Sequence, residues 1–102
     1  MKLEHASPRW LKTQIKRAVG KYLDLKKYNL FLFGSRVAGD SFEHSDIDIG
    51  IEGARRVSYG TIAKIEEELE EIPVLYTIDL IDFRSTDSRF KKVAKKHIEI
   101  IN

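Results

Sequence analysis

Residues 30–51 read LFLFGSRVAGDSFEHSDIDIGI, and this stretch decides the fold. Residues 30–33 are apolar at every position, which fits a short interior strand covered on both faces. Ile47, Ile49 and Ile51 alternate with aspartate and glycine, the period of a strand with one buried and one solvated face. We therefore expect two strands, the first of which ends at Gly34.

Helical patterns flank these strands. Ser7 and Pro8 fit an N-cap and first turn, so we expect a helix that runs to about Leu25. A second amphipathic helix should end at Pro73, because proline cannot continue it. Its apolar positions are Ile62, Ile65, Leu69 and Ile72.

The rest of the chain predicts a third strand at residues 76–83 and a last helix. That helix should begin at Ser85, Thr86 or Asp87 and bury Phe90, Val93, Ala94, Ile98 and Ile101. The resulting order indicates an α+β fold, with a small mixed sheet and helices mainly on one face. A chain of 102 residues has the length of one domain, so we interpret residues 1–102 as a single domain.

The composition excludes several classes of protein. The sequence has no cysteine, so disulfides, thiolate zinc sites and thiol nucleophiles are ruled out. No segment approaches the roughly 20 apolar residues that span a bilayer, and the first residues lack the pattern of a signal peptide. We therefore expect a cytoplasmic protein that does not enter a membrane.

Asp46 and Asp48 are the first candidate site residues. Two positions apart on a strand, their side chains point the same way, roughly 6–7 Å apart. Anions that close repel one another, and a hard cation such as Mg²⁺ would relieve the repulsion. The alternative is a pair of aspartates on a solvated strand face.

Gly34, Ser35 and Arg36 form a candidate phosphate-binding turn. Glycine lets the backbone approach a ligand, the serine hydroxyl can bond a phosphate oxygen, and arginine can add a charge-assisted bond. A short helix starting at Ser35 would add its N-terminal amides. The alternative is an ordinary turn at a strand end, and the pattern is weaker than a P-loop.

A third carboxylate should come from the strand at residues 76–83, where Asp79 and Asp82 compete. Strand parity places Asp79 on the face opposite Tyr76, Ile78 and Leu80. If that larger apolar set faces the helices, Asp79 lies beside Asp46 and Asp48. We favour Asp79, and expect Asp82 to be a surface charge or a cap partner.

The joint pattern of Gly34-Ser35, Asp46-Ile47-Asp48 and Asp79 resembles the minimal nucleotidyltransferases of the DNA polymerase β superfamily, from about residue 30 onward. The resemblance implies their palm-like nucleotidyltransferase fold. It also implies that Asp46, Asp48 and Asp79 are catalytic and bind a pair of Mg²⁺ ions. Ser35 and Arg36 would then hold the β- and γ-phosphates of ATP or another nucleoside triphosphate.

Relatives of this size resemble antitoxins that adenylylate a HEPN-type toxin, typically on tyrosine. We therefore expect transfer of AMP from ATP to a hydroxyl of such a partner, within a homo- or hetero-oligomer. One rival is an enzyme acting on a small molecule or an RNA end. Another is a non-catalytic module that neutralises its partner by contact.

Lys91, Lys92, Lys95 and Lys96 form a basic cluster on the expected last helix. We interpret it as a solvated helix face, so direct nucleic-acid binding is not expected. Contact with an acidic partner or RNA is the alternative interpretation.

Overall fold

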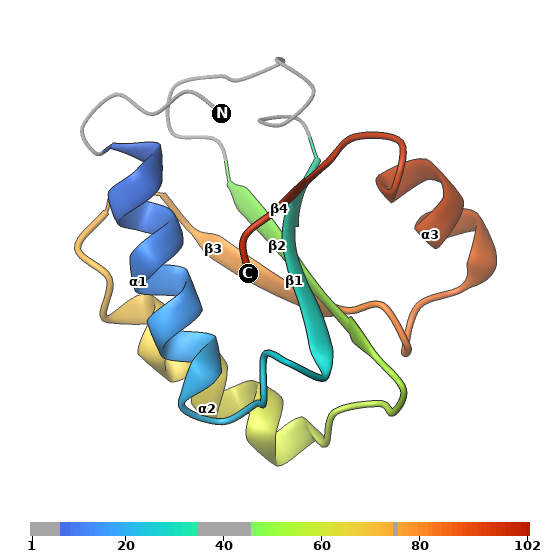
Figure 1. Cartoon of the computed structure of the whole chain (residues 1–102), viewed down its shortest axis with the longest axis horizontal. Helices are drawn as coiled ribbons and strands as arrows, with labels where there is room; N and C mark the ends of the chain where they lie inside the picture. Colours follow the sequence, from blue (N-terminus) through green and yellow to red (C-terminus); the bar gives the residue numbers. More distant parts are fainter. Residues whose placement is uncertain (1–6, 35–45, 75) are drawn as a thin grey trace.

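The computed structural model describes residues 7–34, 46–74 and 76–102. In this part of the chain, four strands form one mixed sheet in the order β3-β2-β1-β4 (Figure 1). The central strand β1 (Tyr28–Phe33) runs antiparallel to β2 (Ile47–Gly53) and to β4 (Ile98–Ile100). β2 runs parallel to β3 (Ile78–Asp82), and helix α2 (Tyr59–Glu70) connects these two strands. The expected α+β fold with a small mixed sheet is confirmed.

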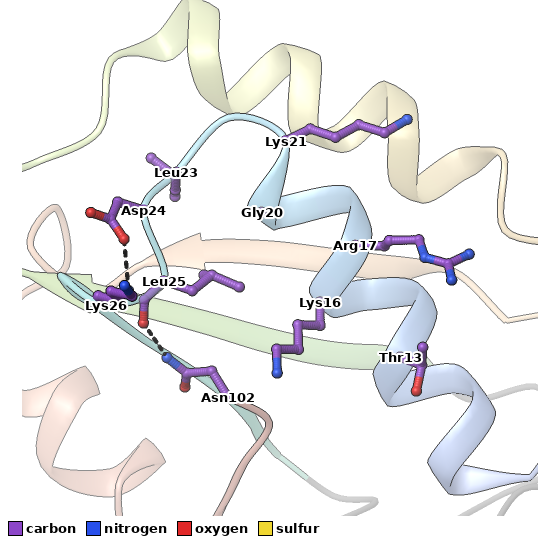
Figure 2. Close-up of a pocket in the computed structure, with 10 residues that line it drawn as sticks. All are labelled: Thr13, Lys16, Arg17, Gly20, Lys21, Leu23, Asp24, Leu25, Lys26 and Asn102. Atoms are coloured by element: carbon purple, nitrogen blue, oxygen red, sulfur yellow. Dashed lines mark hydrogen bonds between the residues drawn. The ribbon is translucent and has the colours of Figure 1, made fainter.

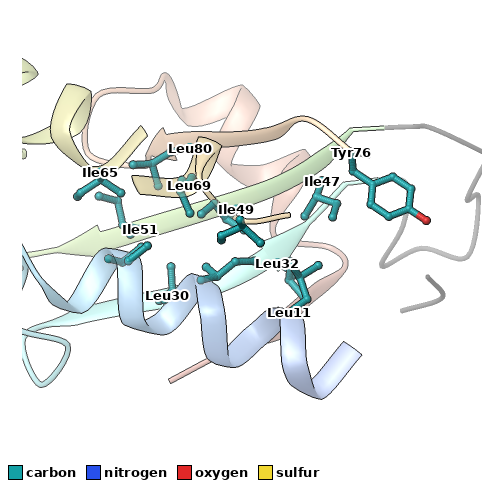
Figure 3. Packing of buried hydrophobic residues seen from close by; sticks show 14 of the residues in the cluster. Leu11, Leu30, Leu32, Ile47, Ile49, Ile51, Ile65, Leu69, Tyr76 and Leu80 are labelled. Carbon is teal, nitrogen blue, oxygen red and sulfur yellow. The ribbon is translucent and has the colours of Figure 1, made fainter. Parts of the chain in front are cut away.

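Two helices cover one face of the sheet. α1 (Pro8–Gly20) and α2 lie on the same side of the strands in Figure 1. Figure 3 shows the main core between them and the sheet, where the isoleucines of β2 meet apolar side chains from both helices. Its fully buried members include Leu11, Ile15, Val19, Leu30, Ile47, Ile49, Ile51 and Ile65. We call this side of the sheet the helix face.

α1 begins at the cap that the sequence predicts, whereas its expected end at about Leu25 is wrong. Ser7 caps α1 by accepting a hydrogen bond from the Trp10 amide at 3.0 Å. α1 ends at Gly20, five residues before the expected Leu25, and a turn follows. The Asp24 carboxylate stabilises that turn by accepting from the Lys26 amide at 2.9 Å. Leu23 and Leu25 still pack against the core, which explains the misleading apolar spacing.

The opposite face of the sheet carries an aromatic cluster. Phe31, Phe33 and Phe83 are buried there, and Phe90 of helix α3 (Ser88–Ala94) packs edge-on against Phe33 and Phe83. A Cβ atom on Gly50 would lie 2.5 Å from the Phe31 ring and 2.7 Å from the Phe83 ring. β2 therefore needs glycine at this position to leave room for the rings. We call this side of the sheet the α3 face.

The C-terminal helix is much shorter than predicted. Asp87 caps α3, one of the three expected starting points, but α3 ends at Ala94, before Ile98 and Ile101, which the expected helix included. Residues Ile98–Ile100 form β4 along the free edge of β1, so Ile98 is strand and not helix. Phe90 and Val93, expected in the core, are 40% and 66% exposed. None of the helices in the described ranges has both the length and the apolar character to cross a membrane.

Candidate active site

Asp48 and Asp79 occupy matched positions on neighbouring strands. They are Cα partners in the parallel pair of β2 and β3, so both side chains point to the same face. Neighbouring strands lie about 4.8 Å apart, which sets the spacing at which the two carboxylates leave the sheet. Phe33 of the aromatic cluster is the Cα partner of Asp48 in β1, so this face is the α3 face.

The same register extends across all four described strands. Phe33 pairs with Asp48 on one side and with Ile98 of β4 on the other. One row across the α3 face therefore consists of Ile98, Phe33, Asp48 and Asp79, and we call it the Asp48 row. The row is apolar at the β4 end and anionic at the β3 end.

The pKa values of Asp48 and Asp79 are both raised, as expected for two carboxylates held close together in partly buried positions. Burial raises the pKa of Asp48 above its usual range, and the nearby carboxylates of Asp79 and Asp46 raise it further. Burial and the charge of Asp46 likewise raise the pKa of Asp79. Asp46 thus lies near enough to act on both. The ionised forms are disfavoured, and a bound cation would stabilise them.

Asp46 lies immediately before β2, and its side chain is exposed. The amide of Ile47 donates to the carbonyl of Thr77 at 2.8 Å, which joins the start of β2 to the segment before β3. The aspartate pair predicted from the sequence is therefore at the end of the sheet where β2 and β3 both begin. Asp79 joins the pair, as strand parity predicted.

Gly34 lies beside the carboxylates, directly after the Phe33 that pairs with Asp48. Its φ is 89°, a left-handed conformation that favours glycine. The expected end of β1 at Gly34 is confirmed. Ser35 and Arg36, the other two residues of the candidate phosphate turn, lie outside the described residues, so their roles stay predictions.

Asp82 has a different role from Asp79. It is buried, and its carboxylate accepts hydrogen bonds from the Val57 amide at 2.7 Å and the Arg84 amide at 3.0 Å. The expectation of a surface charge is wrong, because Asp82 points to the helix face and anchors the segment before α2. Its side chain is a structural hydrogen-bond acceptor.

The donor chemistry fits a hard divalent cation. Carboxylate oxygens are the ligands that Mg²⁺ prefers, and the mutual repulsion of these carboxylates is relieved by a cation. Within residues 7–34, 46–74 and 76–102, however, no three acidic or histidine side chains are already arranged around one metal position. The chain presents carboxylates of suitable chemistry, and the assignment of Asp46, Asp48 and Asp79 as metal ligands stays a prediction.

A pocket lies away from these carboxylates. It has a volume of about 830 Å³ and lies beside the C-terminal half of α1 and the turn that follows (Figure 2). Lys16, Arg17, Lys21 and Lys26 line it together with Asp24. A smaller hollow of about 320 Å³ does include Asp79, between β3 and α2, and Glu66 and Glu70 make its rim acidic.

Known proteins are similar to this chain in sequence and in structure. The family model described as "Polymerase beta, Nucleotidyltransferase" matches residues 11–102. A curated relative, the probable protein adenylyltransferase MntA of Haemophilus influenzae, is 27% identical over 74 residues. The aligned region is 72% of this chain and 65% of that protein, so the chain spans less than two thirds of the relative's length.

Solved structures share the fold. One is a chain from a toxin–antitoxin crystal structure with AMP-PNP, at 21% identity and a TM-score of 0.74, covering 89% of this chain and 72% of that one. Another comes from the complex of the tri-AMPylated HEPN toxin of Shewanella oneidensis with MNT antitoxin. It has 18% identity and a TM-score of 0.70, and the match covers 92% of this chain and 71% of that one.

Proposed function

Since this chain belongs to the polymerase beta nucleotidyltransferase family, we propose that it transfers AMP from ATP to a tyrosine hydroxyl of a HEPN-type partner protein. One observation carries the proposal: Asp48 and Asp79 are register partners on one sheet face, with Asp46 close enough to raise the pKa of both. That arrangement of carboxylates suits metal-assisted phosphoryl chemistry. The partner class is supported by the similarity to MntA and to toxin–antitoxin chains.

Asp46, Asp48 and Asp79 are the residues that would hold Mg²⁺. Bound there, Mg²⁺ would neutralise charge on the phosphates and help to align the attacking and leaving oxygens. Gly34 has no side chain, and the Asp48 carboxylate occupies the space that a Cβ atom there would need, so glycine lets this carboxylate lie against the backbone of the turn. Ser35 and Arg36 keep their sequence-based assignment as ligands of the β- and γ-phosphates.

The proposed step is a substitution at the α-phosphorus of ATP. The acceptor oxygen forms a bond to that phosphorus, the bond to the oxygen that bridges the α- and β-phosphates breaks, and pyrophosphate leaves. The hydroxyl proton passes to a carboxylate oxygen of Asp79, which faces the same side of the sheet as Asp48. Asp46 and Asp48 would hold the cation, which would supply charge neutralisation at the phosphates.

The test uses the full chain, a HEPN-type protein as the candidate partner, ATP and Mg²⁺. Intact mass spectrometry should show the partner gaining one or more AMP groups, and fragmentation should place them on tyrosine. The double variant Asp46→Ala/Asp48→Ala should remain folded and lose at least about a thousandfold in rate, as expected when metal and charge stabilisation are both removed.

Three results would decide against the proposal. Transfer that persists in the folded double variant would remove the carboxylates from the mechanism. Labelling of a small molecule or an RNA end by the wild-type chain, with the partner unmodified, would assign the enzyme to a different acceptor class. Neutralisation of the partner by the double variant would favour an antitoxin that acts by contact alone.

A further inference from the structure

Exposed apolar side chains gather on α3 and β4. Phe90 and Val93 of α3 are 40% and 66% exposed, and Ile98 and Ile100 of β4 are 38% and 52% exposed. Ile98 and Ile100 pair with Phe33 and Phe31, so their side chains leave the sheet on the α3 face. We call these four residues, Phe90, Val93, Ile98 and Ile100, the α3–β4 surface.

This surface is continuous with the carboxylates. Ile98 is the β4 member of the Asp48 row, two strands from Asp48 and so about 10 Å away at ordinary strand spacing. The Phe90 ring packs on Phe33, the residue between them, at 5.9 Å between centroids. A group lying on the α3–β4 surface is therefore on the same face of the sheet as Asp48, about two strand spacings away.

The two faces of the sheet differ in chemistry near the carboxylates. On the helix face, the hollow between β3 and α2 is lined by Glu66 and Glu70. On the α3 face, the neighbours of the carboxylates towards β1 and β4 are phenylalanine and isoleucine. An acceptor that approaches from the apolar side needs an apolar body and a terminal hydroxyl, which among protein side chains is tyrosine.

Charge on α3 adds a second requirement. Arg89 and Lys92 are exposed on this helix, and within residues 7–34, 46–74 and 76–102 neither has an ion-pair partner. Lys95, by contrast, is paired with Glu52 at 2.6 Å. A segment seated on the α3–β4 surface would therefore lie beside a helix whose exposed side chains carry positive charge that is unpaired within the described ranges, which favours acidic residues next to the tyrosine.

Building on the proposed function, we propose that the α3–β4 surface docks the acceptor segment, and that this segment is a tyrosine flanked by acidic residues. The ring lies on Phe90 and Ile98, with its hydroxyl towards Asp48 and Asp79. Arg89 and Lys92 attract the flanking carboxylates. The surface selects the acceptor, whereas the aspartates carry out the transfer.

The test measures transfer of α-labelled AMP from ATP and Mg²⁺ to two synthetic copolymers, one of glutamate with tyrosine and one of lysine with tyrosine. The wild-type chain should label the acidic copolymer and discriminate against the basic one. Val93→Ser/Ile100→Thr should lower kcat/KM for the acidic copolymer about tenfold, through KM, because apolar contact area is lost. Arg89→Glu/Lys92→Glu should lower kcat/KM for the acidic copolymer by a similar factor and should raise labelling of the basic copolymer.

Two control variants distinguish a loss of docking from a general effect of changing surface charge or exposed apolar area. Arg17→Glu/Lys26→Glu makes the same change in charge at the pocket beside α1. Tyr59→Ser removes another exposed apolar residue, 84% exposed at the start of α2. Both controls should stay within about twofold of wild type, the effect of an ordinary surface substitution.

Equal labelling of the two copolymers, or equal losses in the control variants, would overturn the docking surface and leave the proposed function intact. A wild-type chain that labels neither copolymer would also overturn it. The mass of the HEPN-type partner in a parallel reaction then shows separately whether the proposed function fails as well.

Discussion

The carboxylate of Asp48 fills the space in which a side chain on Gly34 would begin. A Cβ atom built on Gly34 would lie 2.5 Å from Oδ2 of Asp48, and the φ of Gly34 is 89°. The glycine of the candidate phosphate turn and the first aspartate on β2 are thus fitted to each other. Separated by 14 positions in the sequence, they are brought together by the pairing of Phe33 with Asp48.

Gly34→Ala should therefore damage both stability and activity. The left-handed backbone costs a residue with a side chain about 1–3 kcal/mol, and the new methyl group must displace the Asp48 carboxylate. We expect the free energy of unfolding in urea to fall by that amount and AMP transfer to fall more than tenfold.

Gly60→Ala is the matched control for that change. Gly60 lies in the first turn of α2, and a Cβ atom there has open space around it in the described structure. Alanine is the better helix former, so stability should stay equal or rise by up to about 1 kcal/mol. A Gly34→Ala variant as stable and active as Gly60→Ala would contradict the fitted arrangement.

Asp48→Asn should stabilise the protein at neutral pH. A carboxyl group whose pKa is raised by folding binds its proton more tightly in the native state, so stability falls as pH rises from about its usual value of 3.8 through the raised pKa. Above that window the full penalty applies. Removing the charge should add about 1 kcal/mol at pH 7, or about 4–8 °C in Tm, and the gain should shrink towards pH 4.

Thermal unfolding between pH 4 and pH 8 checks this pH dependence. Asp87→Asn is the control, because asparagine caps a helix about as well as aspartate and α3 keeps its N-cap. Addition of Mg²⁺ with a non-hydrolysable ATP analogue should raise the Tm of wild type and leave Asp48→Asn nearly unchanged. A lower Tm for Asp48→Asn at pH 7 would mean that its charge is stabilising.

The parity of residues 76–83 gave the correct side for Asp79 but not the environment of Asp82. Alternation along a strand shows which residues share a face, and Asp79 does face Asp48. The buried position of Asp82 depends on Val57, a residue of the loop before α2 whose amide needs an acceptor. No pattern local to β3 contains that information.

β4 was missed for a related reason. Phe90, Val93, Ala94, Ile98 and Ile101 have helical spacing, and a three-residue strand has too few positions to show its own period. What makes residues 98–100 a strand is pairing with β1, more than 60 positions earlier in the chain. By contrast, the sequence patterns that predicted strands correctly belong to segments that bury a whole face, such as residues 30–33 and the isoleucines of β2.

Asp79 and Asp82 should give opposite results when each is changed to alanine. Asp82→Ala leaves the amides of Val57 and Arg84 without their acceptor, which costs about 1–3 kcal/mol in urea unfolding. Asp79→Ala relieves repulsion with Asp46 and should cost little stability, yet it should abolish AMP transfer. An Asp82→Ala variant that is fully stable but inactive would reverse the assignment of the two residues.

Asn102 should stabilise the junction between the C-terminal segment and β1. Its side chain accepts from the Leu30 amide at 3.0 Å and donates to the carbonyls of Leu25 and Tyr28, both at 2.8 Å. Because Leu30 is buried, Asn102→Ala leaves its amide without an acceptor and should cost about 1–3 kcal/mol. Hydrogen exchange at Ile101, whose amide donates to the Leu30 carbonyl, should quicken.

Asn29→Ala is the control, because it changes an exposed side chain in the same strand. Its free energy of unfolding should stay within about 0.5 kcal/mol of wild type. Equal losses for both variants would show that the Asn102 contacts are not specific.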